Sequence, residues 1–158
     1  MKKTQFFRIN QRIDEKLLAA FVKFLEKIKK YPDTEFVYLM FDTKGGELSS
    51  AVKIIKLINK SEIKFVGIAY GAVHSAAIPI FLSTHIRIGY KGSSALIHRA
   101  KKVDSKISNI KMGTIEKQIF EIISEKISIP LKKVYKMADE RTYLTMEHPL
   151  GKRFFIGH

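Results

Sequence analysis

Three short segments of the chain carry residue types that could perform acyl-transfer chemistry. They contain the glycine pair Gly45-Gly46, then Ser75 followed by Ala76, and finally His98. A serine hydroxyl is a weak nucleophile, and a neighbouring histidine can activate it by accepting its proton near neutral pH. Backbone N–H groups at glycine turns and helix starts can stabilise the negative oxygen of a tetrahedral intermediate. The three segments therefore predict a serine-dependent acyl transfer.

Each segment also has a plainer structural interpretation, and the segments taken singly leave both open. Gly45-Gly46 fits an ordinary turn between a strand and a helix. Ser75 fits a helix N-cap, and His98 fits a strand-end histidine bonded to backbone or water. The remaining histidines have no comparable setting: His74, His85, His148 and His158. The chain has no cysteine and no H-x-x-H or H-E-x-x-H pattern, so neither a metal site nor a cofactor is expected.

Hydrophobic patterning predicts the elements that must position these residues. Nearly continuous apolar runs at 35–41 and 63–70 are typical of buried strands, the second ending at Gly71. Apolar residues at three- and four-residue spacing predict amphipathic helices around them. The other expected strands are 5–9, 84–88 and 94–97, and the expected helices are 14–28, 48–58, 75–82, one within 105–127, and 131–138. After Arg141 we expect irregular chain with a short β-prone piece near Tyr143. Alternating strands and helices predict parallel βαβ units, and hence an α/β fold.

The predicted sheet brings the three segments to one edge. In parallel sheets, ligands bind beyond the carboxyl ends of the strands. Gly45-Gly46 follows the strand 35–41, Ser75 follows the strand that ends near Tyr70, and His98 follows the strand 94–97. We therefore expect a hydroxyl, an imidazole and free backbone amides to lie together at that edge.

Length and composition restrict the class of protein. A chain of 158 residues fits a single domain, 1–158. No long uncharged apolar run and no signal peptide are apparent, so we expect a cytoplasmic protein without a membrane segment. The net charge of +14 comes mostly from lysines spread along helical segments, as on solvated helix faces. The one compact basic patch, 98–102, lacks aromatic residues for base stacking, which disfavours nucleic-acid binding.

Taken in order, the segments resemble the proteolytic subunit of the Clp protease family (ClpP-like serine peptidases). The family's strand, S-P-G-G turn and following helix are similar to FVYLMFDTKGGELSSAVKIIKLI. Its nucleophile strand and helix are similar to FVGIAYGAVHSAAIPIFLS, and its histidine segment is similar to SSALIHRA. The resemblance runs from about Phe6 to Thr145, which is nearly the whole chain.

This resemblance implies a fold, an activity and an assembly. The implied fold is a ClpP/crotonase-like spiral of βαβ units with a protruding handle helix at about 105–127. The implied activity is that of a serine endopeptidase, which cuts short or unfolded polypeptides through an acyl-enzyme at Ser75. His98 would be the base, and the N–H groups of Gly46 and Ala76 would form the oxyanion hole. The implied assembly is a homo-oligomeric ring, built on head-to-tail interfaces.

The sequence departs from the family pattern at several positions. Lys44 stands where the family has proline, and Arg141 stands where it has the aspartate of the triad. Asp139 and Glu140 are the nearby acids that could orient the imidazole. Phe6 already lies in the first matching strand, so the extension that forms axial loops is expected to be absent. This leaves an AAA+ unfoldase partner doubtful.

Three alternatives remain beside the peptidase. A catalytically inactive ClpP-like subunit would have a structural or assembly role. A crotonase-like acyl-thioester enzyme would share the paired oxyanion amides but would not need a serine nucleophile. A basic nucleic-acid binder would show affinity that falls steeply with salt.

Overall fold

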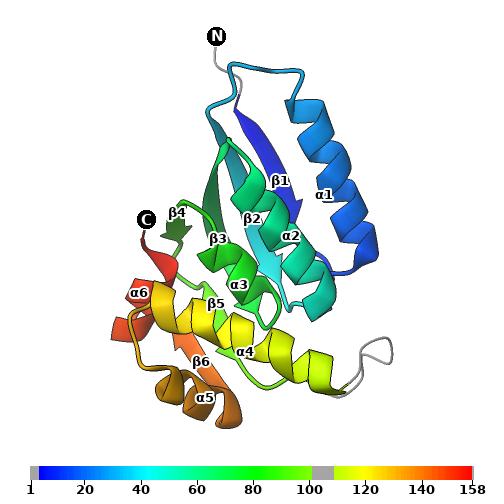
Figure 1. Ribbon diagram of the computed structural model, residues 1–158. Coiled ribbons are helices and arrows are strands. Elements are labelled where there is room, and N and C mark those ends of the chain that lie inside the picture. The colour runs from blue at the N-terminus through cyan, green and yellow to red at the C-terminus, as the bar shows by residue number, and fades with distance from the viewer. Residues whose placement is uncertain (1–3, 101–108, 158) are drawn as a thin grey trace.

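One mixed β-sheet organises the structure, a computed structural model that describes residues 4–100 and 109–157 (Figure 1). Within these residues the sheet order is β1-β2-β3-β5-β6, and β4 pairs with β3 beside this path. The strands are β1 (Gln5–Ile9), β2 (Phe36–Thr43), β3 (Lys64–His74), β4 (Ile86–Gly89), β5 (Ser94–Ile97) and β6 (Thr142–Thr145). All strand pairs are parallel except β5 with β6, which is antiparallel. The predicted α/β class with parallel βαβ units is confirmed.

The helices lie beside the sheet and beyond its β6 end. The helices are α1 (Glu15–Ile28), α2 (Leu48–Lys60), α3 (Ala77–Leu82), α4 (Asn109–Lys126), α5 (Leu131–Asp139) and α6 (Pro149–Phe155). In Figure 1 the first three lie on one side of the sheet, and α4 runs across the carboxyl ends of the central strands next to α3. The expected handle helix corresponds to α4, and positions 105–108 of that prediction lie outside the described residues. Among the described helices, none is long and apolar enough to cross a membrane.

The first turn and the buried face of helix α1 both follow from its sequence. The Asp14 carboxylate accepts a hydrogen bond of 2.9 Å from the Leu17 N–H, which stabilises a helix start by about 1 kcal/mol. Leu17, Phe21 and Ile28 point to one side and are fully buried. The Phe21 ring lies 6.2 Å from the ring of Phe65 on β3, so the stripe packs directly on the sheet.

The prediction that Gly71 ends the third strand is wrong. Strand β3 continues to His74, because Ala72, Val73 and His74 pair with the start of β5. The Ala72 N–H donates a hydrogen bond of 2.9 Å to the Asp42 carboxylate, and a side chain at Gly71 would collide with that carboxylate. Gly71 therefore makes room for a contact from β2 and does not interrupt the strand.

The prediction of an irregular tail after Arg141 is also wrong. The β-prone piece near Tyr143 is the strand β6, and it is followed by the helix α6. Pro149 occupies the first turn of α6, and the His148 ring accepts a hydrogen bond from the Leu150 N–H. Phe154 and Phe155 are fully buried against Phe81 of α3. Burial of these two rings holds in place a helix of only 7 residues.

Candidate active site

Ser75 lies in a strained turn between β3 and α3. Its φ is 54°, a left-handed conformation that non-glycine residues adopt rarely and at a cost of about 1–3 kcal/mol. The Ser75 N–H donates to the Leu96 carbonyl at 3.0 Å, and its carbonyl accepts from the Ile78 N–H at 3.0 Å. Ser75 is not the N-cap of α3, since Ala76 holds that position and no side chain caps it. Strain of this kind occurs most often where function requires a particular side-chain direction.

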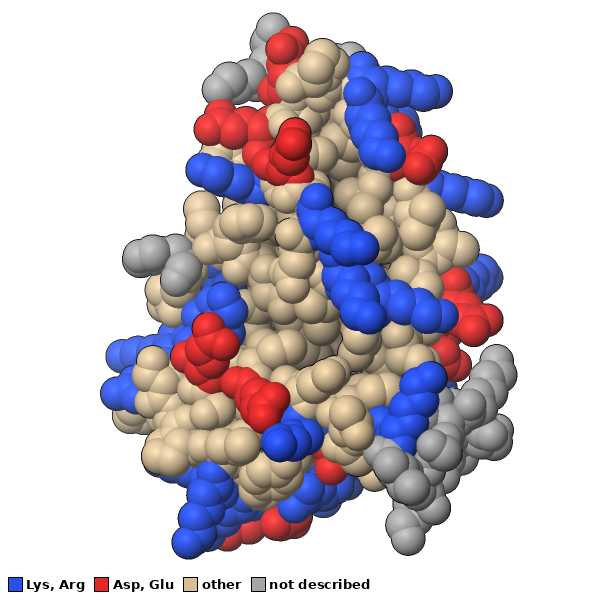
Figure 2. All heavy atoms as spheres, in the orientation of Figure 1, with Lys and Arg blue, Asp and Glu red and all other residues tan. Residues whose placement is uncertain are grey.

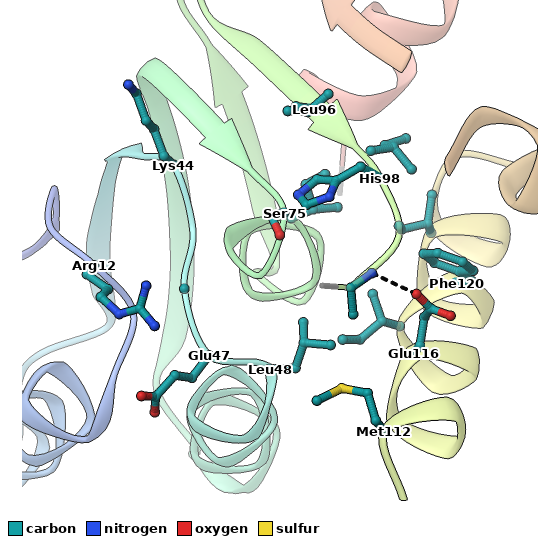
Figure 3. Close-up of a pocket in the computed structure, with 16 residues that line it drawn as sticks. Arg12, Lys44, Glu47, Leu48, Ser75, Leu96, His98, Met112, Glu116 and Phe120 are labelled. Atoms are coloured by element: carbon teal, nitrogen blue, oxygen red, sulfur yellow. Dashed lines mark hydrogen bonds between the residues drawn. The ribbon is translucent and has the colours of Figure 1, made fainter. Parts of the chain in front are cut away.

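His98 leaves the neighbouring strand at the same edge of the sheet. Strands β3 and β5 are parallel, and His74 is paired with Leu96, so Ser75 and His98 both follow directly after paired strand ends. Figure 3 shows the His98 imidazole turned toward the Ser75 side chain. Both side chains are half-buried, and both line one pocket. The tertiary structure thus brings together the two residues that the sequence analysis selected as nucleophile and base.

The turn of Gly45 and Gly46 lies against the turn of Ser75. Gly45 has a φ of 97°, and a Cβ added to it would come within 2.6 Å of the His74 carbonyl oxygen and 3.0 Å of the Ala76 nitrogen. Gly46 is bridged to Ile13, whose backbone nitrogen would lie 2.7 Å from an added Cβ. Because neither glycine has a side chain, their turn can lie close to the backbone of the Ser75 turn on one side and to that of Ile13 on the other.

Two backbone N–H groups beside Ser75 have no hydrogen-bond acceptor within residues 4–100 and 109–157. The N–H of Gly45 donates to Thr43 Oγ1 at 3.2 Å, and the N–H of Glu47 donates to the Ile13 carbonyl at 2.7 Å. None of the hydrogen bonds formed among the described residues uses the N–H of Gly46 or of Ala76. These are the two amides that the sequence analysis expected to stabilise an oxyanion.

The pocket that contains Ser75 and His98 has a volume of about 580 Å³. This size suits a ligand of a few amino-acid residues. Its apolar lining comes from Met112, Ile119, Phe120 and Ile123 of α4 together with Leu48, Ile78, Leu96 and Ile97. Arg12 and Glu47 lie on the side of the pocket away from His98 (Figure 3). The exposed side chain of Lys44 also lines the pocket.

The two acids considered as orienting groups for His98 both contact basic side chains. The Asp139 carboxylate accepts a hydrogen bond of 2.7 Å from Arg99 Nε, and this bond holds the pKa of Asp139 below its usual value. Glu140 lies 3.8 Å from the ammonium of Lys136. Arg141 lies directly before β6 and has a left-handed φ of 52°. Arg99 and Lys136 are thus the observed partners of these carboxylates.

His74 belongs to the surroundings of the site, although the sequence analysis set it aside. Its Nε2 lies 2.9 Å from Ser94 Oγ, and its ring packs edge-on against Tyr143. Burial, together with the nearby positive charges of Lys44 and His98, lowers the pKa of His74. The position was missed because β3 was expected to end at Gly71. Continuing the strand alternation past Gly71 would have placed His74 next to β5.

Comparison with known proteins agrees with this architecture. The family model described as Clp protease matches residues 1–150. The chain belongs to the Clp protease family. Among solved structures it is similar to ClpP1 from Listeria monocytogenes, with a TM-score of 0.82 and 17% sequence identity over 96% of this chain and 88% of that chain. An asparagine-to-aspartate mutant of the same protein gives a TM-score of 0.83 at the same identity and coverage.

These comparisons confirm the resemblance and the ClpP-like fold that the sequence analysis expected. At 17% identity the structural likeness concerns the fold, and the roles of individual residues rest on the geometry of this chain.

The basic patch at 98–102 is only partly described. Arg99 is bound to two carboxylates, and positions 101–102 lie outside the described residues. Figure 2 shows a short row of basic side chains over α2, where Lys53, Lys56 and Lys60 are exposed, and a scatter of basic and acidic groups elsewhere on that face. This distribution is typical of solvated helix faces.

Proposed function

We propose that the protein is a serine endopeptidase in which Ser75 is the nucleophile and His98 the general base. The observation that carries the proposal is the convergence of the strained Ser75 turn and the His98 side chain on one pocket at the same sheet edge. Family membership supports it, because Clp proteases are typically serine peptidases.

The proposed reaction has two halves. Ser75 Oγ attacks the carbonyl carbon of the peptide bond while His98 accepts the hydroxyl proton, giving a tetrahedral intermediate. The intermediate collapses as His98 passes that proton to the leaving amine, and the acyl group stays on Ser75 as an ester. Water then attacks the ester, with His98 again accepting a proton and returning it to Ser75.

The proposed oxyanion hole consists of the N–H groups of Gly46 and Ala76. Both amides lack an acceptor among the described residues, and their turns lie in contact beside Ser75. Donors fixed in place before the reaction stabilise the developing charge without reorganisation, and one such donor contributes about 10²- to 10³-fold to kcat.

The pocket also indicates which peptides would bind. The α4 wall supplies apolar surface for a side chain next to the cleaved bond. Arg12 and Lys44 are exposed, and neither takes part in an ion pair among the described residues. Two cations without such partners at the pocket favour peptides that carry a carboxylate some residues from an apolar side chain.

Assembly is part of the proposal. Proteins of the Clp protease family form homo-oligomeric rings, and we propose that this chain assembles into rings as well. A closed ring requires a head-to-tail interface, in which two different surfaces of the same chain meet.

Covalent labelling with a fluorophosphonate tests the proposed nucleophile. We expect the wild-type protein to be labelled at Ser75, and Ser75→Ala to lose both labelling and peptide hydrolysis. His98→Gln should lower the labelling rate by about 10²- to 10⁴-fold, the usual contribution of a general base. Ser49→Ala, on α2 outside the pocket, is the matched control and should react like wild type. Full hydrolysis by Ser75→Ala would refute the acyl-enzyme and favour crotonase-like chemistry.

The second candidate function is that of a catalytically inactive subunit. It is favoured by one specific observation: the carboxylates of Asp139 and Glu140 contact Arg99 and Lys136. In a serine protease, loss of the orienting acid lowers kcat by about 10⁴-fold. Ring-sized particles of folded wild-type protein that do not react with the fluorophosphonate would support the inactive subunit.

A further inference from the structure

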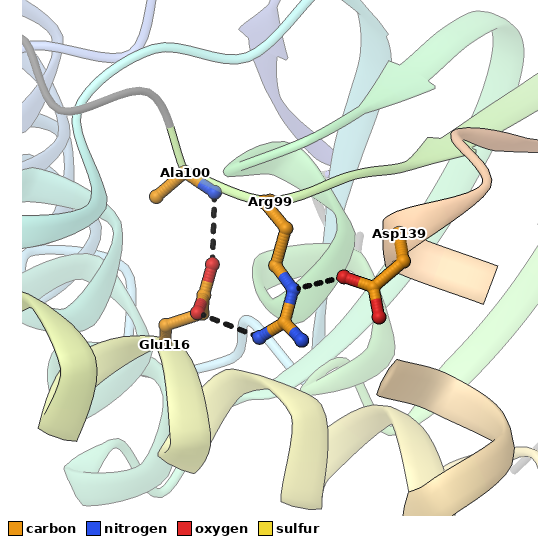
Figure 4. A network of polar contacts seen from close by, with 4 residues as sticks. All are labelled: Arg99, Ala100, Glu116 and Asp139. Atoms are coloured by element: carbon orange, nitrogen blue, oxygen red, sulfur yellow. Dashed lines mark hydrogen bonds and ion pairs between the residues drawn. The ribbon is translucent and has the colours of Figure 1, made fainter. Parts of the chain in front are cut away.

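The residue that follows His98 connects the His98 segment to two helices. Arg99 Nε donates to Asp139 Oδ1 on α5 at 2.7 Å, and Arg99 Nη1 donates to Glu116 Oε2 on α4 at 3.2 Å. The other oxygen of Glu116 accepts from the Ala100 N–H at 2.9 Å. Figure 4 shows these four residues, which we call the Arg99 network. Both positions after His98 are thereby fixed.

Two aromatic rings pack against the Arg99 guanidinium. Its central carbon lies 4.8 Å from the ring centroid of Tyr135 on α5 and 5.6 Å from that of Phe120 on α4. A planar guanidinium can stack on rings and donate several hydrogen bonds at once, which an ammonium group cannot do. These contacts suit arginine better than lysine, and they join the segment directly after β5 to α4 and α5 at one point.

This network differs from an isolated surface ion pair. The Glu116 side chain is only 18% exposed and lines the same pocket as His98. Single exposed pairs contribute little to stability, whereas networks with fixed geometry contribute more. Hydrogen bonds to Asp139 and Glu116 raise the pKa of Arg99, and the bond to Arg99 lowers the pKa of Asp139. The Arg99 guanidinium and the Asp139 carboxylate are therefore both charged at neutral pH.

We propose that Arg99 is a positioning residue that holds the strand end of His98 against α4 and α5, so that the imidazole keeps its direction toward Ser75. The inference rests on the proposed function, in which His98 is the base. It gives Asp139 a different role from the one suggested by its sequence position, because Asp139 would act on the base through Arg99. A base displaced by about 1 Å can cost about 10²-fold in rate, so this positioning has a measurable consequence.

Three variants test the proposal: Arg99→Gln, Asp139→Asn and the double variant. We expect each single variant to lower kcat by about 10- to 100-fold while KM changes little, because substrate contacts are retained. The double variant should be no worse than the poorer single variant, since both remove the same connection. Lys117→Gln is the matched control, because Lys117 forms an ion pair with Glu121 at 3.8 Å on the outside of α4. It should leave kcat unchanged.

The conservative variant Arg99→Lys separates positioning from general stability. Lysine can reach one carboxylate but cannot bridge two while stacking, so we expect a kcat between those of wild type and Arg99→Gln. If Asp139→Asn lost activity while Arg99→Gln retained it, Asp139 would be the direct orienting acid and the proposal would be wrong. Wild-type kcat in Arg99→Gln and Asp139→Asn alike would also overturn it.

A readout that does not depend on activity keeps this inference distinct from the proposed function. Ring signals of His98 in NMR spectra report the position of the imidazole even in an inactive protein. They should shift in Arg99→Gln and in Asp139→Asn but not in Lys117→Gln, with urea unfolding confirming that all variants are folded. Unchanged His98 signals in folded Arg99→Gln would refute the positioning role, whatever the outcome of the labelling experiment.

Discussion

The backbone N–H of Ser75 donates a hydrogen bond of 3.0 Å to the carbonyl oxygen of Leu96. Leu96 lies two residues before His98, so the Ser75 turn and the His98 segment are connected through main-chain atoms. Because the bond joins main-chain atoms, we expect it to remain when the side chain of Ser75 or His98 is replaced. Loss of activity in such variants should then report on chemistry and not on a rearranged turn.

Gly46→Ala should impair both folding and catalysis. The added Cβ would meet the backbone of Ile13, and overpacking of this kind lowers the free energy of unfolding by about 1–3 kcal/mol. Displacement of the Gly46 amide should lower kcat by about 10²- to 10³-fold. Urea unfolding and peptide hydrolysis measure the two effects.

Gly113→Ala is the matched control for Gly46→Ala. Gly113 is exposed in α4, and an added Cβ would have no atom within 4 Å. The change should raise the free energy of unfolding by about 0.5–1 kcal/mol and leave hydrolysis unchanged. If Gly46→Ala and Gly113→Ala had the same effects on the free energy of unfolding and on peptide hydrolysis, the special role of Gly46 would be contradicted.

The stability of the protein should decrease on mild acidification, partly through His74. Burial, with Lys44 and His98 nearby, lowers the pKa of His74, so the unfolded chain binds the proton more readily than the folded protein. The free energy of unfolding keeps the full contribution of neutral His74 above a pH of about 6.5, the pKa of histidine in the unfolded chain. It loses this contribution as the pH falls below that value. His74→Gln should therefore show a smaller loss of unfolding free energy between neutral pH and about pH 5. Identical pH slopes in both proteins would exclude this contribution.

Arg87 should be required for the attachment of α6. Its side chain is 4% exposed and donates to the carbonyls of Phe154 at 3.0 Å and Arg153 at 3.3 Å. Arg87→Met leaves these carbonyls without donors and should lower the free energy of unfolding by about 1–3 kcal/mol, measured in urea. Arg153→Met changes an exposed side chain of α6 and should have an effect within about 0.5 kcal/mol. Similar losses in both variants would contradict the role of Arg87.

Lys44 and Arg12 should bias the choice of substrate. Paired peptides that differ only by Glu or Gln near the cleaved bond would be compared by kcat/KM. We expect a preference for the acidic peptide that falls about two- to fivefold in Lys44→Gln or Arg12→Gln, the effect of one exposed ion pair. Added salt should weaken the preference as well. Lys53→Gln on α2, outside the pocket, should retain the preference for the acidic peptide. If none of the three substitutions changed this preference, the role of Lys44 and Arg12 in substrate choice would be refuted.

Local patterns in the sequence were sufficient for most of the fold. The spacing of Leu17, Phe21 and Ile28 predicted α1, and the apolar run at 35–41 predicted β2, because side-chain period follows directly from backbone geometry. The order of elements then predicted parallel βαβ units. It also brought Ser75 and His98 to one sheet edge, since parallel strands end on the same side.

The tertiary structure decided the features that depend on distant partners. Strand β3 passes Gly71 because Asp42 and β5 bind its last residues, and α6 forms where Phe154 and Phe155 can be buried. Asp139 binds Arg99, 40 positions away in the sequence. A carboxylate pairs with the cation that the folded chain brings closest to it. The distance between two residues so far apart in the chain cannot be read from the sequence.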